Sequence, residues 1–529
     1  MIKILVSDKL SSDGLAILSN GGQFEVDYKP EITPEEIEST IEQYDALVIR
    51  SRTTVTSSII AKANRLRVIG RAGVGVDNVD VPAATKKGII VMNTPDGNTI
   101  STAEHTFTML CALARSIPQA VQSMREGRWD KKKIVGVELY NKVLGIVGLG
   151  RIGGNVAKKA LAFGMRVIAY DPFISDDAAR RLGVTLATVN EICSKADFIT
   201  VHTPLNDATR NIISTDQFNL MKPTVRVVNC ARGGIINEDA LCKALETGKI
   251  AGAAIDVFTK EPLDPNSPLR KFPNVNLTPH LGAATTEAQE GVARDIANQI
   301  VEMLRGEMIH NAVNAPTTDP AVLEKISPYI DLARKMGRFL SQYVTSRVCE
   351  LRLNYSGTIL EYPTKPISSG ALVGLLETNT EGAVNFVNAH VIAKERGVEL
   401  VEKTSSKLYD LSSLVTLTVI TEDNQKVSLG GSVVFGKQPR IVSMNEKFFD
   451  IRPEGILLVI ENHDVPGVVG QVGTLFGKYH VNIDQMTWGK DESSDKAITV
   501  INADSEVPSG LIDELVENSN IISAHIIIL

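Results

Sequence analysis

The chain has 529 residues with a formal net charge of −7, and 43% of its residues are hydrophobic. This length predicts about three or four domains, and the composition is typical of a globular protein. The slightly acidic balance argues against nucleic acid as a partner, and no stretch is long and apolar enough to predict a membrane span. Five widely separated cysteines without metal-ligand spacing favour a cytoplasmic protein with reduced thiols and no metal site.

The first 98 residues alternate between strand and helix patterns. Apolar runs predict strands at Ile2–Val6, Phe24–Asp27, Ala46–Arg50, Leu66–Gly70 and Ile89–Asn93. Helical patterns fall between them at Gly14–Leu18, Pro34–Ile41, Ser57–Ala63 and Pro82–Lys86. Such repeated units predict an α/β fold with a doubly wound parallel sheet. Polar residues stand at two strand ends, where such sheets bind ligands: Arg50, Ser51 and Arg52 at the third strand, and Arg71 at the fourth.

A long helical pattern covers residues 99–126, and Pro118 predicts a kink or a break within it. The basic segment Arg128–Lys133 follows, and it includes Lys131. Charge runs of this kind are usually a solvated surface. A solvated face and a contact to substrate both remain open for this segment.

A glycine-rich turn lies between a strand, Val143–Val147, and a helical pattern, Asn155–Phe163, with Val156, Ala160 and Phe163 on one face. The turn is G-x-G-x-x-G, with Gly148 in the tight bend, Gly150 at the phosphates and Gly153 against the helix. The next strand, Arg166–Tyr170, ends at Asp171, whose carboxylate is expected to bind the adenosine ribose hydroxyls. Pro172 and Phe173 offer no cation for a 2′-phosphate, which favours NAD over NADP.

Later strands are predicted at Phe198–His202, Arg226–Asn229, Ala251–Val257 and Val275–Thr278. Just beyond three of them stand Arg232, Glu261 and His280, and strand ends of one parallel sheet converge in space. An arginine fork can grip a substrate carboxylate, an imidazole can take a hydroxyl proton, and a carboxylate can orient that imidazole. Singly, each residue is more often an ordinary loop side chain. Together, after a dinucleotide turn, they predict oxidation of a 2-hydroxy acid.

These residues lie in segments that resemble the signatures of the D-isomer-specific 2-hydroxyacid dehydrogenase family. The segments are Gly70–Asp80, Val91–Pro95, Gly148–Gly153, Asn229–Gly234, Asp256–Pro262 and Thr278–Ala283, and the resemblance covers about residues 1–315. Within the family, the chain is similar to members that oxidise 3-phospho-D-glycerate to 3-phosphooxypyruvate, the first step of the phosphorylated route to L-serine.

The resemblance implies a catalytic set of Arg232, Glu261 and His280. It implies cofactor contacts at Gly148, Gly150, Arg151, Ile152, Gly153, Asp171, Thr203, Cys230, Ala231, Asp256, Gly282 and Ala283, with Asp256 facing the nicotinamide carboxamide. It implies substrate contacts at Arg50, Ser51, Arg52, Arg71, Asn93 and Lys131, with Lys131 reaching a neighbouring subunit's site. A homotetramer is the assembly that it suggests.

Residues 456–529 show strand and helix patterns in the order βαββαβ, which is ferredoxin-like. This part of the chain resembles an ACT regulatory domain. The resemblance lies in Asp464, Pro466 and Gly467, which precede a helix, and in Asn482, which stands at the next strand. The resemblance implies L-serine as effector, with Asp464 and Asn482 as contacts. A domain that only dimerises remains the alternative, and Asn462 replaces a larger residue of some relatives.

The expected domains are a discontinuous substrate-binding domain (1–98 plus 283–315), a Rossmann NAD-binding domain (99–282), an α+β intervening domain (318–450) and an ACT domain (455–529). A helix predicted at Ala288–Arg305 returns to the first domain, and a linker is predicted around residues 314–318. Two alternative functions stay open. One is oxidation or reduction of another D-2-hydroxy acid, such as 2-hydroxyglutarate or glycerate, and the other is a non-enzymatic NAD-sensing protein.

Overall fold

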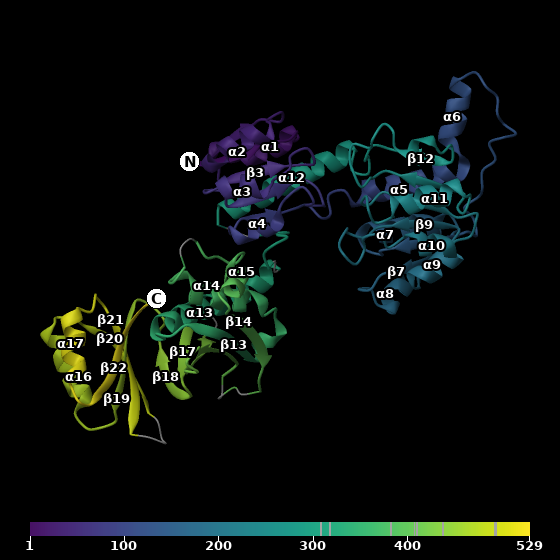
Figure 1. Ribbon diagram of the computed structural model, residues 1–529. Helices are drawn as coiled ribbons and strands as arrows, with labels where there is room; N and C mark the ends of the chain where they lie inside the picture. The colour runs from purple at the N-terminus through teal and green to yellow at the C-terminus, as the bar shows by residue number, and fades with distance from the viewer. Residues whose placement is uncertain are drawn as a thin grey trace.

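The computed structural model describes residues 1–306, 309–316, 319–380, 383–406, 408, 411–435, 438–490 and 495–529. Within these residues the chain forms four sheets, which Figure 1 shows in three bodies. No helix in this part of the chain is long and apolar enough to cross a membrane. The end of the predicted linker, Thr317 and Thr318, lies outside the described residues.

The first body contains a parallel sheet in the order β2-β1-β3-β4-β5. All five predicted strands are present, with ends shifted by one or two residues: β1 Ile2–Val6, β2 Phe24–Tyr28, β3 Ala46–Ile49, β4 Val68–Arg71 and β5 Ile90–Met92. The helices are α1 Ser12–Ser19, α2 Pro34–Thr40, α3 Ser57–Lys62 and α4 Val81–Lys86. Thr33, Thr56 and Asp80 cap three of them by accepting a backbone N–H, as their positions before each helix favour.

One helix from much later in the chain completes this body. Helix α12, Thr286–Leu304, buries Val292, Ile296 and Ile300 in the same core as Ile4 and Val6 of β1. The chain therefore leaves the first sheet, forms the second body and returns to the core of the first.

Two helices join the bodies where the sequence predicted one interrupted helix. Helix α5, Thr99–Arg115, ends at Ser116, whose φ of 50° lies in the left-handed region, and α6, Ile117–Arg125, follows. Pro118 lies in the first turn of α6, where the missing N–H costs nothing. The break is thus complete, and Figure 1 shows α6 projecting from the second body.

The second body contains a seven-stranded parallel sheet in the order β12-β11-β10-β9-β6-β7-β8. Its strands are β6 Val143–Val147, β7 Arg166–Tyr170, β8 Thr185–Leu186, β9 Phe198–Val201, β10 Arg226–Asn229, β11 Gly252–Ile255 and β12 Val275–Leu277. Helices α7 Arg151–Ala162, α8 Asp176–Arg181, α9 Val189–Lys195, α10 Thr215–Leu220 and α11 Glu238–Glu246 connect them. Val156 and Ala160 are buried as expected, whereas Phe163 follows the end of α7 and is 55% exposed, its ring edge-on to Phe107.

The third body begins with a six-stranded sheet in the order β14-β13-β15-β16-β17-β18. The strands are β13 Val348–Gly357, β14 Glu399–Thr404, β15 Ser413–Thr421, β16 Lys426–Val434, β17 Gln438–Met444 and β18 Lys447–Ile451. Helices α13 Pro320–Tyr343 and α14 Lys365–Glu377 pack closely, because a Cβ on Gly374 would lie 1.8 Å from the carbonyl oxygen of Arg334. The sequence predicted neither helix, and a further helix, α15, covers Ala389–Glu395.

The fourth sheet has the order β20-β21-β19-β22 and confirms the ferredoxin-like prediction. Its elements are β19 Ile456–His463, α16 Val468–Lys478, β20 Ile483–Lys490, β21 Lys496–Ala503, α17 Ser509–Val516 and β22 Ile521–Ile528. One face packs against α16 and α17, and the other buries Leu457, Val459 and Ile527 in the core of the third sheet. The two C-terminal sheets therefore share one hydrophobic core.

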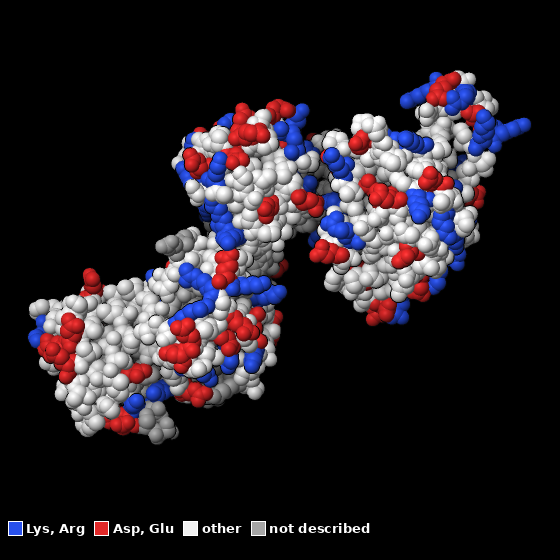
Figure 2. Space-filling view, viewed as in Figure 1, with Lys and Arg blue, Asp and Glu red and all other residues white. Residues whose placement is uncertain are grey.

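The third body docks on the first at the turn between α4 and β5. The Asn385 side chain donates to the carbonyl oxygen of Gly88 at 2.9 Å, and Lys86 pairs with Glu395 at 2.6 Å. Val387 is 6% exposed and belongs to the core of the first body. Basic and acidic side chains are interspersed over the face shown in Figure 2.

Candidate active site

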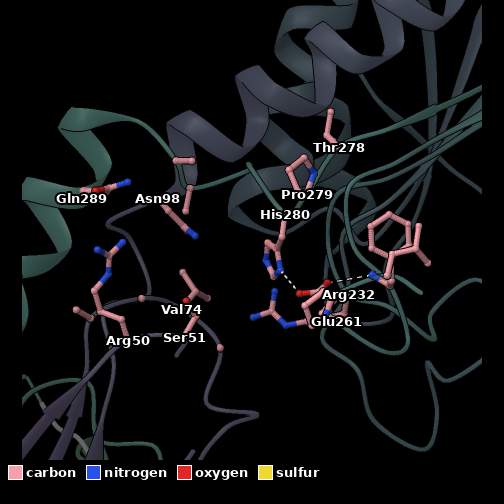
Figure 3. A pocket seen from close by; sticks show the side chains of 18 of the residues that line it. Arg50, Ser51, Val74, Asn98, Arg232, Glu261, Thr278, Pro279, His280 and Gln289 are labelled. Carbon is pink, nitrogen blue, oxygen red and sulfur yellow. Dashed lines mark hydrogen bonds and ion pairs between the residues drawn. The ribbon is translucent and has the colours of Figure 1, made fainter. Parts of the chain in front are cut away.

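A cavity of about 750 Å³ lies between the first and second bodies, at the carboxyl ends of their strands. The first body contributes Arg50, Ser51, Arg71 and the turn at residues 72–75. The second contributes Arg232, Glu261 and His280, from loops after β10, β11 and β12. Figure 3 shows the two groups facing each other across the cavity. Ala283 also lines the cavity, so the structure brings together seven of the residues that the sequence singled out.

His280 and Glu261 form an ion-pair geometry in this cavity. Nδ1 of His280 lies 2.7 Å from Oε2 of Glu261, and the other carboxylate oxygen accepts the Phe258 N–H at 3.0 Å. Burial by itself would raise the pKa of Glu261, but these two hydrogen bonds hold it below its ordinary value. The Glu261 carboxylate is therefore ionised. Because it contacts Nδ1 of His280, the other ring nitrogen, Nε2, lies on the side of the ring away from Glu261.

Arg232 crosses the cleft between the two bodies. Its Nε donates to Oδ2 of Asp77 at 2.9 Å, and Nη1 donates to the carbonyl oxygen of Ala231 at 2.7 Å. Its Nη2 lies over Gly75, since a Cβ there would be only 1.9 Å from that nitrogen. The guanidinium is thus carried by the second body and oriented by a turn of the first.

Arg71 is a second cation in the same cavity. Burial, with the positive charge of Arg232 nearby, lowers its pKa to about 10, which still leaves it charged at neutral pH. Its buried Nε has no hydrogen-bond partner among the described residues. Arg50 adds a third cation, whose Nη1 donates to the carbonyl oxygen of Lys9 at 3.2 Å. Three guanidinium groups facing one cavity favour an anionic ligand.

Three of the predicted substrate contacts do not line this cavity. Arg52 donates to Asp8 at 3.2 Å and to two backbone carbonyls, so it stabilises the strand ends of the first sheet. Asn93 donates to the carbonyl oxygen of Val74 and so supports the cavity turn from behind. Lys131 is exposed in the segment after α6.

The cavity also contains polar residues that the sequence did not single out, namely Asn98, Arg270 and Gln289. Asn98 precedes α5, and its buried Oδ1 has no partner among the described residues. Arg270 is held by the carbonyl oxygens of Leu263 and Asp264. Each is a single polar residue outside any motif, so no sequence signal distinguishes it from a surface side chain.

The glycine turn has the geometry that a dinucleotide phosphate needs. Gly148 has a φ of 98°, and a Cβ on Gly153 would lie 2.1 Å from the carbonyl oxygen of Gly148. A Cβ on Gly150 would meet nothing within 4 Å, so the space before the first turn of α7 is open. These are the three separate requirements of tight turn, close helix packing and phosphate approach.

Other predicted cofactor residues surround this turn. Asp171 accepts the N–H groups of Leu149 and Phe173, each at 2.9 Å. Arg151 pairs with Asp96 of the first body at 2.7 Å, and the buried Oγ1 of Thr203 has no partner among the described residues. Ile152 and Ala231 are half-buried, and Cys230 is 4% exposed, where burial raises the pKa of its thiol.

Asp256 is fully buried beneath the loop that carries His280. Its carboxylate accepts from Thr278 Oγ1 at 2.5 Å, from Leu281 N–H at 2.8 Å and from Gly282 N–H at 3.0 Å. Burial opposes ionisation, but these bonds and His105 hold the pKa of Asp256 below its ordinary value. Ala283, the next residue of this loop, lines the cavity.

The predicted effector residues lie at opposite ends of the fourth sheet. Asp464 follows β19 and pairs at 2.6 Å with Lys490, the last residue of β20, whereas Asn482 precedes the first residue of β20. The eight residues of β20 separate them. Asn462 is fully buried and accepts from Thr499 at 3.0 Å, so its side chain is committed within the sheet.

A dinucleotide-binding sheet with arginine, glutamate and histidine at its strand ends defines a dehydrogenase of 2-hydroxy acids. Residues 107–282 match the NAD binding domain of D-isomer specific 2-hydroxyacid dehydrogenases. Residues 325–445 match the D-3-phosphoglycerate dehydrogenase intervening domain, and residues 456–520 match the ACT domain.

The relatives extend this match over the whole chain. The D-3-phosphoglycerate dehydrogenase of Synechocystis is 43% identical and covers 99% of this chain and 94% of its own. That of Methanocaldococcus jannaschii is 44% identical, with 98% of each chain covered. The chain belongs to the D-3-phosphoglycerate dehydrogenase family.

Solved structures resemble the first two bodies. The TT0316 protein from Thermus thermophilus has a TM-score of 0.55 and 33% identity, and it covers 59% of this chain and 100% of its own. A D-lactate dehydrogenase from Aquifex aeolicus, complexed with NAD and lactic acid, has a TM-score of 0.54 and 25% identity, and it covers 60% of this chain.

Proposed function

We propose that the protein oxidises 3-phospho-D-glycerate to 3-phosphooxypyruvate with NAD, as the first step of L-serine biosynthesis. The observation that carries the proposal is the cavity in which Arg50, Arg71 and Arg232 face the His280–Glu261 pair. The substrate has an anionic group at each end, and the cavity offers cations from both bodies. The names of the full-length relatives point to the same reaction.

Each member of the catalytic set has a role that its contacts support. Arg232 holds the substrate carboxylate and polarises the C2 oxygen through the guanidinium edge that Asp77 and Ala231 leave available. Nε2 of His280 takes the C2 hydroxyl proton as the carbon–hydrogen bond breaks. Glu261 orients the imidazole through Nδ1 and stabilises the imidazolium that forms.

The residues around the glycine turn fit NAD. The N-terminus of α7 and the open space at Gly150 suit the pyrophosphate, and Asp171 suits the ribose hydroxyls. The buried Thr203 hydroxyl, which has no partner among the residues that the structure describes, is free to bond the cofactor. NAD supplies the hydride acceptor for the C2 hydrogen. We assign seven further residues to this cofactor: Arg151, Ile152, Cys230, Ala231, Asp256, Gly282 and Ala283.

Arg50, Ser51 and Arg71 are the residues that we assign to the substrate phosphate. The unpartnered Nε of buried Arg71 supports this, because a buried donor without an acceptor is costly. Arg52 and Asn93 do not contact the phosphate in this proposal. They stabilise the backbone around the subsite through their bonds to Asp8 and Val74. Lys131 would reach the cavity of a neighbouring subunit.

The wider organisation is also part of the proposal. We divide the chain into a substrate-binding domain (1–98 plus 283–315), an NAD-binding domain (99–282), an intervening domain (318–450) and an ACT domain (455–529). Several large apolar side chains on and after α6 are exposed, namely Ile117, Val121, Met124 and Trp129. They support a homo-oligomer, and we propose that it is a tetramer in the cytoplasm. L-serine is the proposed effector, with Asp464 of one chain and Asn482 of another forming its site.

The deciding experiment is NADH formation at alkaline pH with 3-phospho-D-glycerate and, separately, D-glycerate, each with and without L-serine. We expect turnover of the phosphorylated acid, little turnover of glycerate, and a drop with serine. Equal turnover of both acids would contradict the phosphate subsite, and an absence of turnover with either would contradict the reaction itself.

A further inference from the structure

A histidine that the reaction does not use lies next to the most buried carboxylate of the site. Nε2 of His105, on α5, lies 3.1 Å from Oδ1 of Asp256 and 3.5 Å from Oγ1 of Thr278. Only 18% of the His105 side chain is exposed, and none of the Asp256 side chain is. Because Asp256 is ionised, the His105 nitrogen is the donor in this contact.

Asp256 accepts hydrogen bonds from residues on both sides of His280 in the chain. Its carboxylate accepts from Thr278 before the histidine and from Leu281 and Gly282 after it, while its carbonyl oxygen accepts the N–H of His280 at 2.9 Å. His280 has a φ of 56°, in the left-handed region that a residue with a side chain adopts only when neighbours impose it. The Asp256 carboxylate is the neighbour that imposes it here.

Helix α5 also contacts this loop through a second polar side chain. Besides His105 on the carboxylate, Thr102 Oγ1 donates to the carbonyl oxygen of Gly282 at 3.2 Å. The His105 bond matters most, because a fully buried carboxylate needs every donor that surrounds it to stay ionised. Without that donor the buried charge is less stable, and the pKa of Asp256 would rise.

We propose that His105 is a positioning residue for His280: it keeps Asp256 ionised and oriented, and Asp256 in turn fixes the backbone that aims the catalytic imidazole. The proposal rests on the catalytic role assigned to His280 above. Helix α5 begins at the boundary of the two bodies. Through His105 it controls the geometry of the proton acceptor, Nε2 of His280.

His105, Cys230 and Asp256 together also have the residue types of a metal site, with ligand atoms within 4.8 Å of one another. The hydrogen bonds argue against a cation there. Three donors, from His105, Thr278 and Leu281, already contact Oδ1 of Asp256, which is the oxygen nearest His105, and they leave no lone pair there for a metal. Burial and the charge of Asp256 also raise the pKa of the Cys230 thiol and so keep it protonated.

The test compares His105→Leu, His105→Gln and Met109→Leu in the full-length protein. Met109 is the matched control, since it lies one turn further on α5 and its sulfur also contacts Thr278, at 3.9 Å. We expect His105→Leu to lower kcat at least about tenfold, with a much smaller change in the KM for the hydroxy acid, and to move the acid limb of the pH–rate profile. His105→Gln should recover most of kcat because its amide can donate, and Met109→Leu should stay close to wild type.

Two further readouts separate the possible failures. NADH binding, measured by fluorescence without substrate, should weaken in His105→Leu, because the loop that contains Gly282 and Ala283 is disturbed. Thermal unfolding reports whether each variant is folded. A His105→Leu protein with wild-type kcat, pH profile and NADH binding would overturn the proposal, as would equal losses in Met109→Leu. Wild-type protein without turnover of 3-phospho-D-glycerate would instead refute the proposed function, while NADH binding would still test the link from His105 to the loop.

Discussion

Glu261 and His280 follow two different strands, yet their side chains meet at 2.7 Å through Oε2 and Nδ1. The contact fixes which imidazole nitrogen faces the cavity, because Nδ1 is occupied. Strands β11 and β12 are neighbours in the second sheet, so the loops that follow them converge at one edge. The pairing is therefore a direct result of the strand order.

Replacing Glu261 with glutamine should lower kcat by about tenfold to a hundredfold, because the imidazolium loses its counter-charge. The acid limb of the pH–rate profile should change as well, because the side chain at position 261 no longer ionises. In the wild type the lowered pKa of Glu261 keeps this pair intact at neutral and alkaline pH, and it is lost only in acid, as Glu261 protonates. Steady-state rates across pH 6–10 measure this, and an unchanged limb would contradict the assigned role.

Arg50 and Arg52 are two residues apart, but replacing each of them with glutamine should have a different effect. Arg50→Gln should raise the KM for 3-phospho-D-glycerate by about ten- to a hundredfold, the value of one charge-assisted bond, and affect glycerate little. Arg52→Gln should lower thermal stability instead, because buried Asp8 loses an ion-pair partner. Kinetics with both acids and thermal unfolding of both variants measure the contrast. A larger KM effect from Arg52→Gln would place that side chain at the substrate.

Gly153 and Gly154 form a matched pair in the first turns of α7. Gly153→Ala would place a Cβ 2.1 Å from a backbone oxygen, so we expect a loss of about 1–3 kcal/mol in stability and strongly weakened NAD binding. Gly154→Ala meets nothing closer than 3.9 Å and should be tolerated. NADH titration and chemical denaturation test both, and equal behaviour of the two variants would argue against tight packing at Gly153.

Asp77 and Asp96 each pair with an arginine of the opposite body. Asp77→Asn should raise the KM for the hydroxy acid several-fold, because Arg232 loses the partner at its Nε. Asp96→Asn acts on Arg151 and should change NAD affinity instead. Separate KM values for the two substrates measure this difference. Identical effects would show that both pairs merely hold the bodies together.

Asp464 tests the effector proposal. Asp464→Ala should abolish inhibition by L-serine while the activity without serine stays unchanged, because the residue lies in the fourth sheet, far along the chain from the cavity. Lys490→Ala removes its partner but leaves the carboxylate, so it should retain a serine response. Inhibition curves for both variants measure this, and full inhibition of the Asp464 variant would exclude the carboxylate as a contact.

The parallel sheets were predictable because buried parallel strands are short apolar runs with polar loops. The convergence of Arg232, Glu261 and His280 on one cavity was predictable for the same reason, since each lies just beyond such a run. Helices α13 and α14 were missed for different reasons: α13 contains Pro328, which argues against a continuous helix, whereas α14 is buried on nearly all sides and so shows no amphipathic pattern. Arg52 was assigned to substrate because it stands at the end of the third strand and because the family resemblance implies it, and only the structure reveals its bond to Asp8.

The anchoring of the third body through Asn385, Val387 and the Lys86–Glu395 pair has a mechanical consequence. The anchored turn leads directly into β5, which lies beside β4, the strand that ends at Arg71. The two C-terminal sheets and the body that carries Arg50 and Arg71 are therefore anchored to each other, and none of these three contacts involves the nucleotide-binding body. A displacement of the C-terminal sheets would therefore be passed first to the side of the cavity that carries Arg50 and Arg71.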